Sequence, residues 1–333
     1  MTAAPVLAEV FRGGHQEGQH RGHAVICGPD GEVIEAWGDP GAVIFPRSSC
    51  KMVQALPLVE SGAADAFGLT SAQLALACAS HEAAPIHNDA VRAWLSDLGL
   101  NDSDLECGPQ PPRDREVKHG LIREGHSPCR VHNNCSGKHA GFLTLAKHLK
   151  APTEGYVLPD HPVQQAARAA LEDTAGETAQ GYGIDGCSAP NYRVTLAGLG
   201  RSMASFAAAG ARSDARSRAQ SRLVDAMRSH PLLVAGNGRA CTELMQAGQG
   251  RFAVKTGAEA VFIAILPETG HSIALKIEDG ATRASEAVIA ALLVRLGAVE
   301  PAHPLVQKRM NAVLRNFAGQ EVGEVRAVAG LSG

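Results

Sequence analysis

The sequence has little excess charge, few aromatic side chains and no long apolar run. These absences exclude whole classes of protein. The 31 Lys and Arg against 34 Asp and Glu give a formal net charge of −3, so a basic surface for nucleic acid is not expected. No apolar run approaches the roughly 20 residues that cross a membrane as a helix. Aromatic residues make up only 4% of the chain, and the frequent alanine and glycine predict helices that pack closely through small side chains.

The eight cysteines contain no C-x-x-C pair, and the histidines contain no H-x-x-x-H pair, so the sequence lacks the strong zinc signatures. Residues 1–14 have no basic segment, and Glu9 interrupts their apolar stretch, which argues against a secretory signal. We therefore expect a cytoplasmic protein whose cysteines are free thiols or metal ligands rather than disulfides.

Two short lysine motifs lie about 200 residues apart. The first, Ser48-Ser49-Cys50-Lys51, has the pattern S-x-x-K, and the second, Lys255-Thr256-Gly257, has the pattern K-T-G. Together they are typical of hydrolases in which lysine, not histidine, activates a serine nucleophile. On a helix, residues 48 and 51 share a face, with Cβ atoms roughly 5–6 Å apart. Burial beside a second cation favours a neutral amine, so Lys51 is predicted to take the proton of Ser48.

The order of the predicted elements indicates an α+β fold. The five strand-like segments lie at 23–27, 32–37, 251–256, 260–266 and 272–278. We predict a helix from Ser48 to about Ala64, irregular structure at 101–132 and a last helix at 284–297.

This order predicts a five-stranded antiparallel sheet assembled from both chain ends, with a helical lobe inserted between them. The 333 residues then form one catalytic domain with a sheet lobe, 1–50 plus 245–333, and a mainly helical lobe, 51–244. The arrangement resembles serine β-lactamases and penicillin-binding proteins, and it places the functional cleft between the lobes.

A second group of functional side chains includes two thiols and a lysine. Cys135 and Lys138 lie three residues apart, and Cys187 follows in the glycine-containing segment that begins at Asp185. Two thiolates and a third donor could hold a zinc ion with one position open. Lysine is an unusual ligand because only its neutral amine has a lone pair, so the metal itself would have to displace the proton. We call these three residues the thiol–lysine cluster.

Five motifs occur along the chain in the order Arg47-Ser48-Ser49-Cys50-Lys51, Ala79-Ser80-His81-Glu82, His132-Asn133-Asn134-Cys135-Ser136-Gly137-Lys138-His139, Asp185-Gly186-Cys187 and Lys255-Thr256-Gly257-Ala258-Glu259. Together they resemble the asparaginase II family, the bacterial L-asparaginases of the Rhizobium etli type, which are distinct from the threonine-nucleophile and plant types. The resemblance extends over nearly the whole chain.

The resemblance implies a serine β-lactamase-like fold and an amidohydrolase that converts the small molecule L-asparagine to L-aspartate and ammonia. It implies two Ser–Lys tandems, Ser48 with Lys51 and Ser80 with Lys255. Ser48 is the expected nucleophile, and Ser80 is the alternative that the sequence does not separate from it. The resemblance also implies a zinc ion at the thiol–lysine cluster, which supports substrate positioning without being indispensable for turnover, and a homodimer.

Substrate contacts follow from the charges of asparagine. Its α-carboxylate needs a cation, which Arg47 could supply as a bidentate partner. Its α-amine needs an anion, for which Asp185 or a metal-bound water is the expected neighbour. Asn133 and Asn134 are further candidates for hydrogen bonds to the substrate.

Three other functions compete with asparagine hydrolysis. A β-lactamase or peptidase shares the fold, but the sequence shows no convincing S-D-N motif. A glutaminase is the second alternative, because one methylene changes discrimination by only about 1–3 kcal/mol in a simple pocket. A non-enzymatic amino-acid-binding protein is the third, although binding alone would need neither the serines nor the lysines.

Overall fold

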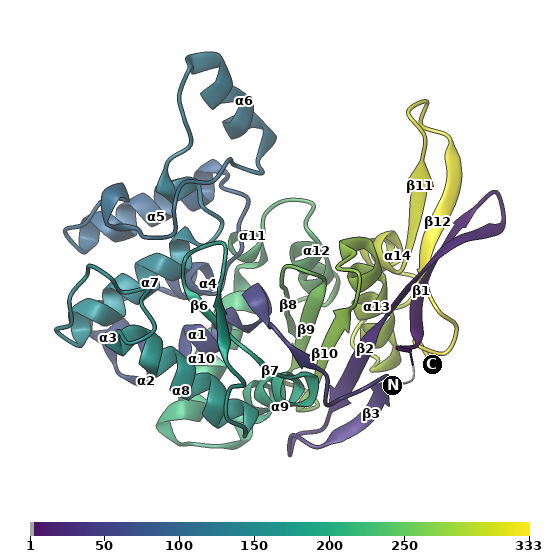
Figure 1. The fold of residues 1–333 in the computed structure, drawn as a ribbon, viewed down its shortest axis with the longest axis horizontal. Coiled ribbons are helices and arrows are strands. Elements are labelled where there is room, and N and C mark those ends of the chain that lie inside the picture. Colours follow the sequence, from purple (N-terminus) through teal and green to yellow (C-terminus); the bar gives the residue numbers. More distant parts are fainter. Residues whose placement is uncertain (1–2) are drawn as a thin grey trace.

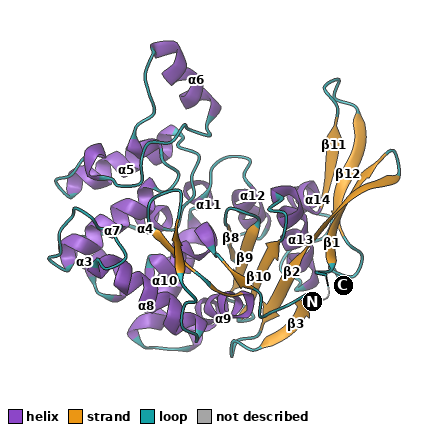
Figure 2. Cartoon of the chain, viewed as in Figure 1, coloured by secondary structure: helices purple, strands orange, loops and turns teal. Residues whose placement is uncertain are grey.

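The computed structural model describes residues 3–333, and Figures 1 and 2 show a large sheet with most of the helices to one side of it. Met1 and Thr2 lie outside this range. They begin the segment for which the sequence analysis predicts no secretory signal. The eight-stranded sheet has the order β11-β12-β1-β2-β10-β9-β8, with β3 paired to β2. Its strands are β1 (Val6–Arg12), β2 (His15–Cys27), β3 (Val33–Trp37), β8 (Ala253–Thr256), β9 (Val261–Leu266), β10 (His271–Ile277), β11 (Asn311–Arg315) and β12 (Glu321–Ala327).

Both chain ends build this antiparallel sheet, which confirms the predicted α+β class and the helical insertion. The prediction of five strands is wrong, because β1, β11 and β12 add a further ribbon beside β2. Strands β11 and β12 and the first half of β2 project beyond the core (Figure 1) and have few buried residues, whereas β1 buries Leu7, Ala8 and Val10. The polar side chains of the projecting segments therefore lack the apolar alternation that marks a half-buried strand. The lobe boundaries at residues 51 and 244 stay a prediction.

The centre of the core lies along β9, whose six residues are all buried. Successive side chains of a strand point to opposite faces, so complete burial requires cover on both faces. Helices α9 (Leu196–Ala207) and α13 (Thr282–Arg295) provide it, since both pack against β9 and β10. The last predicted helix thus corresponds to α13, and the three predicted C-terminal strands correspond to β8, β9 and β10.

The S-x-x-K segment is not one helix. A 3-10 turn, η1 (Arg47–Cys50), leads into α1 (Lys51–Gln54), and two further short helices, α2 (Leu56–Glu60) and α3 (Ala63–Ala66), follow. Pro57 causes the first interruption, since proline has no N–H and its ring clashes with the carbonyl four residues earlier. Residue Gly62, with φ of 82°, allows the second turn.

The remaining helices make up most of the inserted part of the chain. They are α4 (Ser71–Ala77), α5 (Pro85–Asp97), α6 (Arg115–Glu124), α7 (Ser136–His148), α8 (Pro162–Ala175), α10 (Ala215–Ser229), α11 (Pro231–Val234), α12 (Ala240–Ala247) and, after α13, α14 (Pro304–Met310). Within residues 3–333, no helix has both the length and the apolar character needed to cross a membrane.

Helix α6 corrects the prediction of irregular structure at 101–132. Its first turn is capped by Asp114, which accepts a hydrogen bond from Val117 N at 2.9 Å, and it ends at Gly125 in the left-handed region. Both are ordinary helix signals, but the flanking prolines and charges obscured them. The helix has no fully buried residue and projects from the molecule (Figure 1).

Two short two-stranded sheets hold the loops around the site. In one, β4 (Val43–Ile44), just before η1, pairs with the distant β7 (Val194–Thr195). In the other, β5 (Tyr182–Ile184) pairs with β6 (Pro190–Tyr192), so that residues 185–189 form its connecting loop.

The predicted close packing through small residues is confirmed where α7 crosses the end of α4. A Cβ atom added at Gly137 would lie 2.5 Å from the carbonyl oxygen of Leu76. Since the obstacle is backbone, a rotamer change cannot relieve it. Glycine at position 137 therefore sets the distance between the two helices.

Gly137→Ala is expected to lower the free energy of unfolding by about 1–3 kcal/mol, the usual cost of overpacking a core. Urea denaturation measures the change. The matched control is Gly120→Ala in the solvated helix α6, where no atom lies within 4 Å of the added Cβ. That control should be neutral or stabilising by up to about 1 kcal/mol. Equal effects of the two substitutions would contradict the packing argument.

Candidate active site

A cavity of about 330 Å³ opens where η1, the end of α4, the start of α12 and the end of β8 meet. Its lining residues are Ser48, Ser80, Arg113, Asn134, Arg239, Ala240, Cys241, Thr256, Gly257, Ala258, Thr282 and Glu286. Both predicted serines therefore face the same space, although they are 32 residues apart in the sequence. Beside this cavity lie the two predicted lysines.

Ser80 lies between two buried lysine amines. Lys51 Nζ hydrogen-bonds Ser80 Oγ at 3.0 Å, and Lys255 Nζ does so at 2.8 Å. The side chains of Lys51 and Lys255 are 1% and 0% exposed, so water does not compete for these contacts. The structure thus brings three of the four predicted catalytic residues into one hydrogen-bonded group.

Burial lowers the pKa of Lys255 from 10.5 to about 7. The charges of Lys51 and Arg239 act in the same direction and oppose the effect of Cys241. Near neutral pH a substantial part of the molecules therefore holds Lys255 as a free amine. Such an amine, 2.8 Å from a hydroxyl, is placed to accept a proton.

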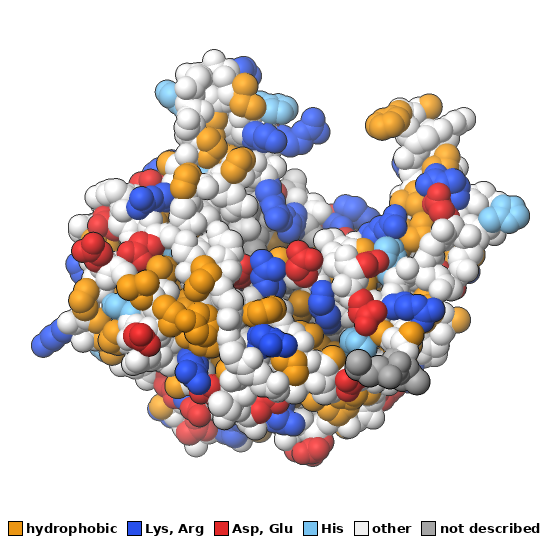
Figure 3. All heavy atoms as spheres, viewed as in Figure 1, with side chains coloured by type: hydrophobic (Ala, Val, Ile, Leu, Met, Phe, Trp, Pro, Cys, Tyr) orange, Lys and Arg blue, Asp and Glu red, His pale blue; other side chains and the backbone are white. Residues whose placement is uncertain are grey.

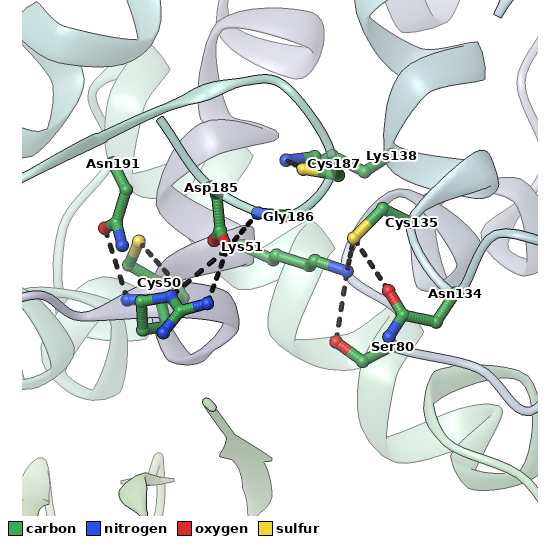
Figure 4. Close-up of polar contacts among 11 residues, drawn as sticks. Cys50, Lys51, Ser80, Asn134, Cys135, Lys138, Asp185, Gly186, Cys187 and Asn191 are labelled. Carbon is green, nitrogen blue, oxygen red and sulfur yellow. Dashed lines mark hydrogen bonds and ion pairs between the residues drawn. The ribbon is translucent and has the colours of Figure 1, made fainter. Parts of the chain in front are cut away.

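Ser48 has a different environment from the one that its spacing to Lys51 predicts. Its side chain is half-buried, and within residues 3–333 it forms no hydrogen bond to Lys51. The three N–H groups of Lys51 instead point to Ala79 O, Ser80 Oγ and Cys135 Sγ. Figure 4 shows the contacts with Ser80 and Cys135. Lys51, at the start of α1, thus extends toward the end of α4 rather than back to Ser48. The Ser48–Lys51 tandem thus stays a prediction.

The K-T-G motif allows β8 to approach η1. A Cβ atom added at Gly257 would lie 2.7 Å from Pro46 O and 3.1 Å from Ser49 N. Only glycine leaves room for this contact. It brings the strand that carries Lys255 against the turn that carries Ser48, which explains why the tripeptide ends in glycine.

The thiol–lysine cluster is assembled from the start of α7 and the β5–β6 loop. Lys138 Nζ donates to Cys187 Sγ at 3.1 Å, and Lys51 Nζ donates to Cys135 Sγ at the same distance. Figure 4 shows Lys138 beside Cys187, with Cys135 turned toward Lys51. All three residues of the cluster are at most 5% exposed. Their sulfur and nitrogen atoms thus lie in a dry part of the protein.

The pKa values of the two thiols shift in opposite directions. The neighbouring thiol of Cys135 lowers the pKa of Cys187 well below its usual value, against the effect of burial, and the charge of Lys138 assists. The neighbouring Cys187, together with burial, raises the pKa of Cys135. Burial works to lower the pKa of Lys138, but the two sulfurs outweigh it and the pKa is raised. These shifts favour a thiolate at Cys187 beside the Lys138 ammonium.

The donor atoms of the cluster, two sulfurs and one nitrogen, are of a kind that can bind zinc. Among the described residues, no group of three or more His, Cys, Asp and Glu side chains is arranged to hold a metal, so a zinc ion here would need Lys138 as its third donor. Two sulfurs and one nitrogen leave a tetrahedral position open. Metal would have to displace a proton from Lys138 and another from Cys135, which makes affinity depend on pH.

Arg47 and Asp185, the two expected partners of the substrate's charges, pair with each other. Arg47 Nε and Nη2 donate to Asp185 Oδ1 at 3.1 and 2.8 Å, and Gly186 N donates to the same oxygen at 2.7 Å. Neither residue lines the cavity. The pair fixes the β5–β6 loop against η1, and the substrate roles of both residues stay predictions.

The two predicted asparagines differ in position. Asn133 is buried, and its side-chain amide donates to Cys107 O at 2.8 Å and Gly108 O at 3.0 Å, so it holds a loop. Asn134 lines the cavity, where its Oδ1 accepts a hydrogen bond from the Cys135 thiol at 2.9 Å. Only Asn134 is placed to contact a bound substrate.

A family model for L-asparaginase II matches residues 8–327 of the chain. The chain belongs to the L-asparaginase II family. This membership indicates an amidohydrolase of the asparaginase type and confirms the resemblance carried by the five motifs. None of the curated proteins compared with the chain matches it.

Solved structures similar to this L-asparaginase II family member are distant from it. A structure of Mglu in its glutamate form is 15% identical, covers 89% of this chain and 65% of its own, and has a TM-score of 0.47. A β-lactamase from Mycobacterium bovis is 13% identical with coverages of 86% and 96% and a TM-score of 0.38. A class C β-lactamase is 14% identical, with coverages of 81% and 89% and a TM-score of 0.43.

The chain spans less than two thirds of the length of the Mglu structures. Similarities at this level carry no argument about chemistry or substrate. Any activity of this family member has to be argued from its own residues.

Three charged residues of the cavity wall were missed by the sequence analysis: Arg113, Arg239 and Glu286. Arg113 and Arg239 follow Pro112 and Gly238 in loops, where no motif singles them out. Glu286 lies on α13, whose period of apolar residues marks only its buried face. These three residues lie near Ser48 and Ser80 only in the folded chain, and no local sequence pattern indicates it.

Replacing Lys255 by methionine should stabilise the family member near pH 7 by about 1–4 kcal/mol, because the buried amine no longer has to be desolvated. The folded pKa of about 7 lies below the ordinary value of 10.5, so the unfolded chain binds more protons between these pH values. Stability of the unchanged protein therefore rises with pH across this window, and the advantage of Lys255→Met should shrink there. Urea denaturation at about pH 7 and about pH 10 measures it.

The exposed Lys118→Met in α6 is the control and should show no such pH-dependent gain. If Lys255→Met were less stable than the unchanged protein at pH 7, burial of the Lys255 amine would not lower the free energy of unfolding, and the prediction would be wrong.

Proposed function

We propose that the protein hydrolyses the side-chain amide of L-asparagine to L-aspartate and ammonia through a serine activated by lysine. The observation that carries this proposal is the Ser80 hydroxyl between Lys51 and Lys255, 3.0 and 2.8 Å from the two amines, beside the cavity that Ser48 also lines. Membership of the L-asparaginase II family supports the substrate class.

The reaction needs one proton to move twice. A neutral lysine amine takes the proton of the serine hydroxyl, and the oxygen forms a bond to the amide carbon. The C–N bond then breaks, and the nitrogen leaves as ammonia with the proton that the lysine holds. Water attacks the resulting ester in the same way, releasing aspartate and restoring the serine. A base with a pKa near the working pH performs both transfers well, and Lys255, with a pKa of about 7, meets this condition.

Ser48 is the proposed nucleophile, and Ser80 with its two lysines is the proposed proton relay. Ser48 is the more open of the two hydroxyls, half-buried against 6% exposure for Ser80, so substrate reaches it more readily. The second candidate is attack by Ser80 itself, which its direct hydrogen bond to Lys255 favours. Both serines are therefore expected to be needed, with only one forming the ester.

The purified protein should release ammonia from L-asparagine faster than from L-glutamine and should leave the β-lactam nitrocefin intact. Ser48→Ala and Ser80→Ala should each lower kcat by about 10²–10⁴-fold, the usual weight of such groups. Peptide mass spectrometry after acid quench should find the aspartyl ester on Ser48.

The exposed Ser96→Ala on α5 is the control and should keep full activity. Nitrocefin hydrolysis without ammonia from asparagine would indicate a β-lactamase-like hydrolase, and faster turnover of glutamine a glutaminase. Full activity of Ser48→Ala, or an ester on Ser80, would reassign the nucleophile.

Zinc at the thiol–lysine cluster is part of the proposal. When bound, the ion would supply positive charge next to the catalytic group, where it helps to orient the substrate. Cys135 and Cys187 would hold it through sulfur, and Lys138 through its neutral amine. Cys135 also accepts a hydrogen bond from Lys51. A metal ion bound by Cys135 would therefore change the surroundings of the Lys51 amine.

Elemental analysis after mild purification should find about one zinc per chain. The double variant Cys135→Ala/Cys187→Ala should lose it, whereas Cys129→Ala, outside the cluster, should retain it. Zinc content should fall as pH is lowered, because Lys138 and Cys135 must release protons to bind the metal. Full zinc content in the double variant would place any metal elsewhere.

A cytoplasmic location and a homodimer complete the proposal. The eight cysteines are free thiols, which suits a reducing compartment. Exposed apolar side chains on the β11–β12 hairpin, Val313 and Phe317, offer a surface for a second copy. Sedimentation of the purified protein decides between monomer and dimer.

A further inference from the structure

Two arginines of the cavity wall have no acidic partner. The exposed Arg113 lies just before α6, and the half-buried Arg239 directly precedes α12; both line the cavity. In the described part of the chain, neither guanidinium forms a salt bridge or a side-chain hydrogen bond. Arg47, by contrast, has its charge balanced by Asp185. The cavity therefore contains two cations whose hydrogen-bond donors are free.

The positive charges of the two guanidinium groups repel one another. Partial burial lowers the pKa of Arg113, and the charge of Arg239 lowers it further. Like charges held together without a counter-ion are unfavourable, and an anion between them would relieve the repulsion. Figure 3 shows Lys and Arg side chains gathered around the hollow between α6 and the projecting β hairpins.

Glu82 fixes both arginine-bearing loops. Its backbone oxygen accepts hydrogen bonds from Arg113 N at 3.0 Å and Asp114 N at 2.9 Å, and its Oε1 accepts one from Asn237 N at 2.8 Å. Gly236, with φ of 117°, makes room for it, since a Cβ there would lie 2.3 Å from Glu82 Cδ. Because Glu82 follows Ser80 by two residues, the arginines are held in a fixed relation to the serine.

The opposite charge comes from Glu286 on α13. Its Oε2 accepts a hydrogen bond from Arg309 Nη1 at 2.7 Å, and Arg309 Nη2 also donates to Gly238 O at 2.6 Å, next to Arg239. The second carboxylate oxygen, Oε1, has no partner among residues 3–333. One wall of the cavity thus offers free donors of two cations and a free oxygen of one anion.

We propose that Arg113 and Arg239 bind the α-carboxylate of a free amino-acid substrate and that Glu286 binds its α-ammonium group. Held at both charged groups, the substrate presents its side-chain amide to Ser48 and Ser80, which line the same cavity. This assignment rests on the proposed amide hydrolysis and names the residues that select the substrate. A site of this kind is expected to reject asparagine in the interior of a peptide, which lacks both charges.

Amides that lack one charged group test the assignment. The substrates are L-asparagine, 3-aminopropanamide without the carboxylate, and succinamate without the ammonium group. Arg113→Gln and Arg239→Gln should each raise KM for asparagine by about 10- to 100-fold, as expected for a charge-assisted hydrogen bond, with kcat changed only a few-fold. Neither substitution should affect 3-aminopropanamide.

Glu286→Gln should raise KM for asparagine and 3-aminopropanamide but leave succinamate unchanged. The control is Arg115→Gln, an exposed arginine just outside the cavity, which should alter none of the three substrates. Equal losses on every substrate would indicate a merely structural role, and unchanged KM values for asparagine would remove these residues from the binding site.

A binding measurement separates this inference from the proposed reaction. Titration calorimetry should show that L-aspartate binds to the unchanged protein and binds at least 10-fold more weakly to Arg239→Gln. Such a difference without ammonia release from asparagine would refute the proposed reaction and leave the binding assignment standing. Normal ammonia release, with asparagine KM and aspartate affinity unchanged in the variants, would refute the assignment alone.

Discussion

Removing lysine amines from water is the constraint on which the site depends. Lys51 and Lys255 are almost fully buried, and both hydrogen-bond the same oxygen of Ser80. Burial favours the neutral amine over the ammonium, and for Lys255 the balance falls near neutral pH. The sheet makes this possible, because β8 delivers one lysine while the helical insertion delivers the other and the serine. Burial of these amines lowers the stability of the fold but keeps a reactive base beside the serine, a compromise that is common at functional sites.

The charge balance of the site explains which substrates suit it. Lys138 is the third buried lysine, and it donates a hydrogen bond to Cys187, whose pKa is lowered. Arg47 and Asp185 neutralise each other. The charged groups of the cavity that have no partner are the guanidinium groups of Arg113 and Arg239 and one carboxylate oxygen of Glu286. The unpaired charge is therefore mainly positive. An anionic or zwitterionic small molecule therefore complements the cavity better than a neutral amide does.

Close backbone contacts at glycine hold these charged groups in register. Gly257 lets β8 meet η1, Gly137 lets α7 meet α4, and Gly236 admits Glu82 between the arginine-bearing loops. Each contact joins segments that are distant in sequence, and in each a Cβ would collide with neighbouring atoms. Rigid support of this kind keeps polar groups in position without rearrangement during the reaction.

The sequence by itself determined the α+β class, the construction of the sheet from both chain ends and the family, because apolar periodicity and short motifs are local properties. It missed β11 and β12, which have few buried residues, and β1, whose buried residues do not alternate regularly with exposed ones. It also missed α6, whose caps lie among prolines. It named Ser80 and Lys255 but expected Lys51 to serve Ser48. Only the tertiary structure decided that Lys51 points to Ser80, that Arg47 pairs with Asp185, and that Arg113, Arg239 and Glu286 share a wall. The physical reason is that a side chain's partners depend on which distant segments are packed beside it, and no local pattern records that.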